Sequence, residues 1–206
     1  MRDLRAEVAA VRRMPQVDAR EWVPLRVPVR GELAASRGGC EVSGAHERSG
    51  QGATNNWLTP RWIIDALGPF DLDPCASEND PLRCAPQGFT WRDNGLSQEW
   101  GGAFVFCNPP YGPHAGKWLA RMAEHGNGIA LVAARTETRP FNPALRSASC
   151  VLFVASRISF IEAKTMQKKD GNGAPSMLLA FGDEAARRLI ASTIPGVRMA
   201  PILRVA

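Results

Sequence analysis

The sequence predicts an α/β fold, with a mostly parallel sheet, helices on both of its faces and a C-terminal antiparallel hairpin. Short apolar segments have the length and composition of buried strands; these are 103–107, 129–134 and 151–155. Segments with helical spacing of apolar residues alternate with them or follow them; these are 60–67, 115–125 and 184–192. Strands that alternate with helices along a chain are typical of a parallel, helix-covered sheet.

The composition predicts an ordinary globular protein. The chain has 206 residues, of which 45% are hydrophobic and 22% are charged, so we expect one domain with an extension. No apolar run approaches the roughly 18 residues of a membrane span. The N-terminus has charges and no long apolar stretch, so we expect no secretory signal, no membrane partner and a cytoplasmic location.

The cysteines and the net charge indicate which metals and partners the protein can have. Five cysteines form no CxxC pair and are accompanied by only three histidines, so we expect free thiols and no metal site. The net charge of +5 is compatible with a polyanionic partner but does not require one.

The N-terminal quarter of the chain differs from the remainder. Residues 1–13 have apolar side chains at helical spacing, which predicts a short helix. Residues 14–51 are rich in proline and glycine and have no sustained period, which predicts extended structure. We therefore expect an extended segment over 1–50 and a folded domain over 56–206.

The first elements of the folded domain are short. Thr59-Pro60 predicts a helix over 60–67 with proline at its first position. A short strand is expected over 70–73 and another over 88–91. The segment 76–102 is otherwise irregular, so this side of the sheet should be trimmed.

The later elements have clearer boundaries. The helix over 115–125 should end at Gly126-Asn127-Gly128. Segments 157–163 and 176–181 flank a glycine-rich loop, which predicts an antiparallel hairpin with a long tip. The helix over 184–192 is the last element.

The sharpest chemical motif is Asn108-Pro109-Pro110-Tyr111, directly after the apolar strand 103–107. Ligands of open α/β sheets bind outside the carboxyl ends of the strands. Two consecutive prolines fix the backbone and remove N–H donors, so the Asn108 side-chain carbonyl and the Pro109 main-chain carbonyl can face one pocket. Two such acceptors hold both hydrogens of an exocyclic amine and free its lone pair for attack. Tyr111, the only tyrosine, offers a flat face for a planar ring.

This motif is one of an ordered set that extends over about residues 56–182. The set consists of Trp57-Leu58-Thr59-Pro60, Phe70-Asp71-Leu72-Asp73-Pro74-Cys75-Ala76, Asp93-Asn94-Gly95-Leu96 with Trp100, Asn108-Pro109-Pro110-Tyr111-Gly112, Ala134-Arg135-Thr136-Glu137-Thr138 with Phe141, and Arg157-Ile158-Ser159-Phe160. In this set the chain resembles the phage-type DNA N6-adenine methyltransferases. The resemblance implies a trimmed, Rossmann-like S-adenosylmethionine (SAM) methyltransferase fold that methylates adenine N6 in double-stranded DNA.

The resemblance also implies a cofactor site. Trp57, Thr59 and Pro60 fall on the segment that lines the SAM pocket in such enzymes, and a helix cap with a packed indole is the alternative. Asp73-Pro74 falls where an acid at the end of the first strand meets the methionine part of SAM, and a helix or turn cap is the alternative. A buried acid requires a cation or hydrogen-bond donors, which fits an ammonium group.

The cofactor pattern departs from that of the broader methyltransferases in one place. Cys75-Ala76-Ser77-Glu78 follows Asp73 where a GxG motif is usual, so the sequence shows no group that holds the SAM carboxylate. Asp93 is the candidate for a contact to the adenosine part, and a loop cap is its alternative role.

Candidate DNA contacts fall after the strand 129–134 and in the predicted hairpin loop. They are Arg135, Thr136 and Thr138, and Lys164, Lys168 and Lys169. A structural salt bridge is the alternative for Arg135, and a solvated run of charges is the alternative for the lysines.

The expected reaction begins with an adenine flipped out of the duplex, and neither a metal nor a covalent enzyme intermediate is needed. Methylation of a protein glutamine or of cytosine N4 stays open, because an Asn-Pro-Pro-Tyr turn serves those amines equally well. A non-catalytic DNA-binding protein of the same fold is the alternative from a different class.

Overall fold

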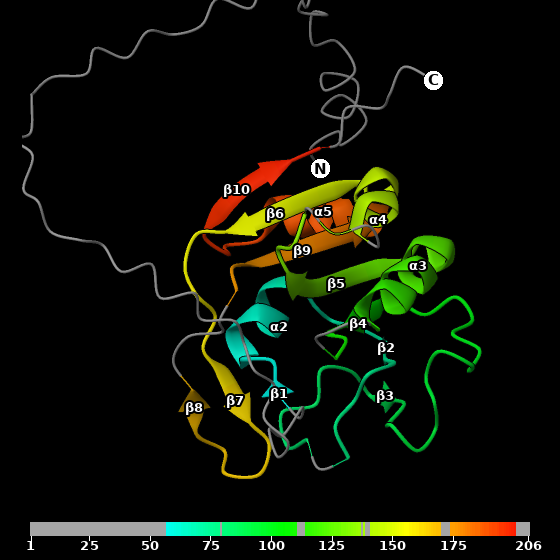
Figure 1. Ribbon diagram of the computed structural model, residues 1–206, viewed down its shortest axis with the longest axis vertical. Helices are drawn as coiled ribbons and strands as arrows, with labels where there is room; N and C mark the ends of the chain where they lie inside the picture. Colours follow the sequence, from blue (N-terminus) through cyan, green and yellow to red (C-terminus); the bar gives the residue numbers. More distant parts are fainter. Residues whose placement is uncertain are drawn as a thin grey trace, which may run out of the picture. The chain divides into compact units, whose positions relative to one another are not determined.

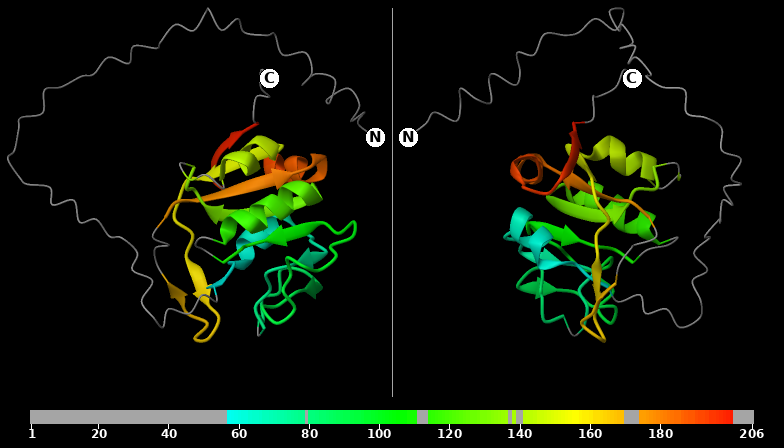
Figure 2. Two further views of the ribbon diagram at one scale, coloured as in Figure 1. Left: turned by 45° about the vertical axis from the view of Figure 1, so that its right-hand side comes forward. Right: turned by 90° about the vertical axis from the view of Figure 1, so that its left-hand side faces the viewer.

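The computed structural model describes residues 57–78, 80–110, 114–136, 138, 141–169 and 174–200. Its centre is a seven-stranded sheet, and a three-stranded sheet projects beside it (Figures 1 and 2). The helix expected over 1–13 and the extended segment over 14–51 lie outside the described residues, so the proposed division of the chain stays a prediction.

The large sheet is mixed. Its strands, in order across the sheet, are β10 (Gly196–Met199), β6 (Cys150–Val154), β9 (Ser176–Phe181), β5 (Gly128–Ala133), β4 (Val105–Cys107), β2 (Leu72–Asp73) and β3 (Gln87–Gly88). The pairs that join β3, β2, β4 and β5 are parallel. The pairs of β9 with β5, of β9 with β6 and of β10 with β6 are antiparallel.

The prediction of a mostly parallel sheet was therefore wrong. Parallel neighbours require a long crossover that returns the chain to the starting edge. The chain instead leaves β6 at its carboxyl end, forms a small hairpin and enters β9 without an intervening helix, so β9 runs opposite to its neighbours.

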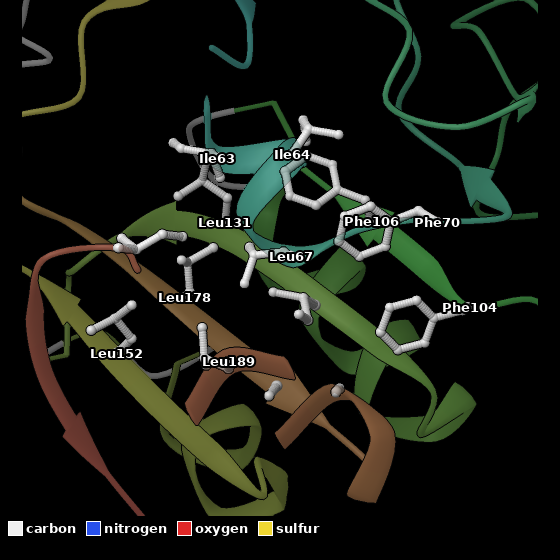
Figure 3. Close-up of a cluster of buried hydrophobic side chains, with 14 of the residues drawn as sticks. Ile63, Ile64, Leu67, Phe70, Phe104, Phe106, Leu131, Leu152, Leu178 and Leu189 are labelled. Atoms are coloured by element: carbon white, nitrogen blue, oxygen red, sulfur yellow. The ribbon is translucent and has the colours of Figure 1, made fainter. Parts of the chain in front are cut away.

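Helices cover both faces of the large sheet, as predicted. The helices α2 (Arg61–Leu67) and α5 (Asp183–Ala191) pack on one face, with the core cluster that contains Leu131, Leu178 and Leu189 (Figure 3). The helices α3 (Ala115–His125) and α4 (Phe141–Ser147) pack on the other. Successive strand residues point to opposite faces, so the alternating side chains of each strand enter the two clusters.

The three helices predicted for the folded domain, over 60–67, 115–125 and 184–192, are confirmed with boundaries within one residue. The helix α3 has the predicted bounds and ends at Gly126, whose φ of 70° is left-handed and whose N–H donates to the Met122 carbonyl at 3.0 Å. The helix α4 and the strand β10 were not predicted.

The predicted hairpin was wrong in its pairing. The strand β7 (Phe160–Glu162) pairs with β8 (Lys168–Lys169) and with β1 (Trp57–Leu58), and these form the small sheet. The segment 176–181 is β9 of the large sheet, and all six of its residues are buried. A fully buried strand must be covered on both faces, which the sheet centre provides and a surface hairpin does not.

Two further expectations from the sequence concern membrane spans and the state of the cysteines. In the part of the chain that the structure describes, no helix combines the length and the apolarity of a membrane span. The described cysteines, Cys75, Cys84, Cys107 and Cys150, are free thiols.

Candidate active site at the carboxyl ends of β2 and β4

The order of strands reverses direction between β2 and β4. The chain passes from β2 to β3 on one side and then returns to β4 on the other side of β2. Ligands of open α/β sheets bind outside the carboxyl ends of strands at such a reversal. The strand β2 ends at Asp73, and Asn108 directly follows β4. The two residues singled out from the sequence therefore lie at the same edge, on neighbouring strands.

Asp73 is a buried carboxyl group with a perturbed pKa. The residue is 7% exposed, and Oδ1 accepts a hydrogen bond from the Cys75 backbone N–H at 2.9 Å. Burial raises the pKa of Asp73 from 3.8 to about 7, and the Cys75 N–H and the Cys84 thiol oppose this only partly. Among the residues that the structure describes, Asp73 has no ion-pair partner. A bound cation would supply the missing charge and lower this pKa.

A pocket beside Asp73 has mostly polar walls. Its lining includes Asp73, Ser77, Asp80, Arg83 and Thr90. The Ser77 hydroxyl oxygen is buried and has no hydrogen-bond partner among the described residues. A buried polar group without a partner is costly, so this oxygen fits a polar ligand. The combination of a buried carboxyl group and an unpaired hydroxyl group fits a ligand with positive charge and additional polar groups, as SAM has.

A larger groove of about 500 Å³ shares Arg83, Cys84 and Ala85 with the lining of this pocket. Its walls are Arg61, Asp65 and Pro69 at the side of α2, together with Arg83 and Pro86. Neither Asp73 nor Asn108 belongs to its lining, so this groove is separate from the site at the ends of β2 and β4.

The loop around Asp93 packs against the turn that follows β2. A side chain at Gly95 would collide with the Pro74 carbonyl, so only glycine fits there. The indole Nε1 of Trp100 donates to the Gly95 carbonyl at 2.8 Å. The Asp93 carboxylate accepts hydrogen bonds from the Thr90 N–H and hydroxyl, both at 2.8 Å, and these bonds lower its pKa. Asp93 thus caps its own loop, and its contact to adenosine stays a prediction.

Asn108 is held from a part of the chain that is distant in sequence. Its Nδ2 donates a hydrogen bond to the Thr59 hydroxyl oxygen at 3.2 Å. Thr59 is 3% exposed and directly follows β1, so the segment of Trp57, Thr59 and Pro60 lies at the carboxyl end of β4. Sequence reasoning placed Thr59 near the cofactor and missed this hydrogen bond, because no local signal relates positions 59 and 108.

The remainder of the motif is described only in part. Pro109 is buried and Pro110 is exposed. Tyr111 lies outside the described residues, so its stacking role stays a prediction.

Residues after β5 lie at the same edge of the sheet as Asn108, because β4 and β5 are parallel neighbours. Arg135 and Thr136 are exposed there. The Thr138 hydroxyl donates to the Arg135 carbonyl at 2.9 Å, and the Thr138 carbonyl accepts from Phe141 N–H at 3.1 Å. Thr138 therefore shapes the turn into α4.

The candidate lysines lie on the β7–β8 hairpin rather than on the predicted longer one. Lys164 lies in its turn and is exposed, as is Lys168 at the start of β8. Lys169 also belongs to β8. The β1–β7 pairing connects this hairpin to the segment that contacts Asn108.

Comparison with known proteins identifies the family. Residues 48–199 match the family described as DNA N-6-adenine-methyltransferase (Dam). The chain belongs to this family. It is accordingly an enzyme that methylates adenine N6 in DNA, as the ordered motifs predicted, and the glutamine and cytosine alternatives are set aside.

A relative from a phage is similar over much of the chain. Over 139 residues, the chain is 29% identical to the DNA N-6-adenine-methyltransferase of Haemophilus phage HP1 (strain HP1c1). The aligned part is 63% of this chain and 79% of the relative. No solved structure matches the chain.

Proposed function

We propose that the enzyme takes its methyl group from SAM and transfers it to an adenine flipped out of double-stranded DNA, with the adenine bound at the carboxyl end of β4. The observation that carries the proposal is that Asp73 and Asn108 lie at the ends of neighbouring strands, where the chain reverses its direction across the sheet. The parallel half of the sheet, covered by helices on both faces, is compatible with a Rossmann-like methyltransferase fold.

The pocket beside β2 would hold the methionine part of the cofactor. SAM supplies an electrophilic methyl group bonded to a positively charged sulfur. The Asp73 carboxylate would pair with the ammonium group, because a buried anion is stabilised by a cation. Ser77 and Arg83, which line the same pocket, would donate hydrogen bonds to the SAM carboxylate in place of the missing GxG motif. Trp57, Pro60 and Asp93 stay predicted cofactor contacts, whereas the hydroxyl group of Thr59, which the sequence also assigned to the cofactor, accepts a hydrogen bond from Asn108.

The turn after β4 would hold the target amine. Asn108 Oδ1 and the Pro109 carbonyl would accept its two hydrogens, which frees the nitrogen lone pair for attack. After the amine gains the methyl group it loses one proton to water, so no protein base is required. Tyr111 would stack on the flipped base and recover roughly 1–3 kcal/mol of the cost of flipping.

The DNA contacts would lie around this edge of the sheet. Arg135 and Thr136 are exposed at the end of β5, and Lys164 and Lys168 are exposed on the β7–β8 hairpin. Lysine and arginine contacts to phosphates would position the duplex without reading its sequence.

The test is the formation of N6-methyladenine in unmethylated duplex DNA, measured by mass spectrometry of the nucleosides. The wild-type enzyme with SAM should form it, and Asn108→Ala should not. Calorimetry should give a SAM affinity for Asn108→Ala within a few fold of wild type, because Asn108 acts on the amine. Wild-type turnover in Asn108→Ala would contradict the assigned role, and a wild-type protein without SAM affinity would contradict the cofactor.

A further inference from the structure

We propose that Thr59 is a positioning residue: its hydroxyl group orients the Asn108 amide so that Oδ1 faces the target amine. The inference rests on the role proposed above for Asn108. It starts from the hydrogen bond of 3.2 Å between Asn108 Nδ2 and the Thr59 hydroxyl oxygen, which joins residues 49 positions apart in the chain.

The Thr59 hydroxyl group is held at a fixed point. On one side, Leu58 pairs with Ile161 of β7, and on the other, the Pro60 carbonyl accepts the Ile63 N–H at 3.0 Å as α2 begins. Thr59 itself is 3% exposed, and its branched Cβ restricts χ1. The strand and the helix therefore fix the backbone on both sides of the hydroxyl group, so it can serve as a reference point for a neighbouring side chain.

The orientation of the Asn108 amide decides whether the site can hold an amine. An asparagine side chain has an acceptor on one side and a donor on the other. With Nδ2 on Thr59, Oδ1 remains to accept a hydrogen of the adenine amine. With the amide turned over, the NH₂ group would face the amine, and two donors would oppose each other.

Other groups near Asn108 do not supply this orientation. Pro109 follows Asn108 directly and has no N–H that could donate to the side-chain carbonyl oxygen of Asn108. Within the described ranges, Thr59 is the one residue hydrogen-bonded to the Asn108 amide. The bond therefore ties the end of β4 to the segment between β1 and α2.

The experiment compares Thr59→Val with Thr59→Ser. Valine keeps the shape and removes the hydroxyl group, whereas serine keeps the hydroxyl group and removes a methyl group. At saturating SAM and duplex DNA, Thr59→Val should lower kcat about tenfold, equivalent to about 1.4 kcal/mol, which is the size of one hydrogen bond. The SAM affinity, measured by calorimetry, should stay within a few fold, and Thr59→Ser should recover most of the rate. Thr193→Val, at an exposed position away from the site, is the matched control.

Each other outcome overturns the inference. If Thr59 instead contacted the cofactor, Thr59→Val would weaken SAM binding and leave kcat at saturating SAM unchanged. A packing role would make Thr59→Ser the more damaged variant, in rate and in melting temperature. If Thr59→Val does not fold, Thr59→Ala provides a second protein without the hydroxyl group, with the same loss of kcat expected.

Asn108→Ala in the same assay separates the two proposals. If Asn108→Ala is inactive while Thr59→Val keeps the wild-type rate, the positioning role fails and the proposed function stands. If Asn108→Ala keeps the wild-type rate, the proposed function itself fails.

Discussion

Replacing Asp73 with asparagine should stabilise the protein in the absence of cofactor and abolish tight SAM binding. Asparagine keeps the shape of the side chain and an acceptor for the Cys75 N–H, whose hydrogen bond to Asp73 is 2.9 Å long. It removes the negative charge, which burial makes unfavourable.

The size and the sign of the effect follow from the pKa of Asp73. Burial raises this pKa from 3.8 to about 7, and at about 1.4 kcal/mol per pKa unit the difference corresponds to about 4 kcal/mol. The folded protein binds the proton more tightly than the unfolded chain, so this contribution to stability is fully present below pH 3.8. It is lost as the pH rises to about 7, which is the folded-state pKa, and is absent above it. The substitution leaves Asn108 and the remaining site unchanged. The free energy of unfolding of Asp73→Asn should therefore exceed that of the wild type by about 2–4 kcal/mol at pH 8.

The assay is urea unfolding of both proteins near pH 5 and near pH 8, without and with SAM. The advantage of Asp73→Asn should be large at pH 8 and smaller at pH 5, and SAM should stabilise only the wild type. The SAM affinity of the wild type should also fall below about pH 7, because a proton then competes with the cofactor for Asp73. An asparagine variant that is no more stable than wild type at pH 8, or that binds SAM with wild-type affinity, would refute the reasoning.

Three further predictions test the target pocket, the DNA contacts and the domain boundary. Tyr111→Phe should keep much of the methylation rate and Tyr111→Ala should lose most of it, because the ring face matters; equal losses would indicate a role for the hydroxyl group. Replacing Lys164, Lys168 and Lys169 with alanine should flatten the slope of log affinity against log salt by about 0.9 per lost phosphate contact, and an unchanged slope would show that they are only solvated. A protein without residues 1–50 should still fold and bind SAM, since the described strands and helices begin at Trp57; a truncated protein that is insoluble or does not bind SAM would contradict this.

The sequence predicted the elements whose signals are local. The helix α3 has apolar spacing and a glycine end, and β4, β5 and β9 are short apolar runs bounded by turns, so each was found within a few residues. The helix α4 was missed because its seven residues include a proline at the third position, which a first turn tolerates but which obscures the pattern. The strand β10 was missed because only alternate residues are apolar and those, Val197 and Met199, are exposed.

The pairing of strands could not be predicted from local signals. The hairpin prediction joined two strands that are neighbours in sequence, but β9 finds its partners, β5 and β6, in the sheet centre. The candidate site was likewise predicted only where the signal is local. Asn108 and Asp73 were found because each directly follows or ends an apolar strand, whereas the partner of Asn108 is set by the tertiary fold, which brings Thr59 beside β4.

The missing GxG motif left open how the turn after β2 is built, and the packing around Asp73 provides an answer. One carboxyl oxygen of Asp73 caps the turn by accepting the Cys75 N–H, and Gly95 lets a second loop close over the Pro74 carbonyl. Gly88 allows the end of β3 to approach Ala76 in the same way. The glycines that make close approach possible thus come from neighbouring segments rather than from the turn itself. The only partners of the Asp73 carboxyl group among the described residues are neutral, the Cys75 N–H and the Cys84 thiol, so a cation can still supply the missing charge. Asp73→Asn should therefore retain the turn and lose the cofactor.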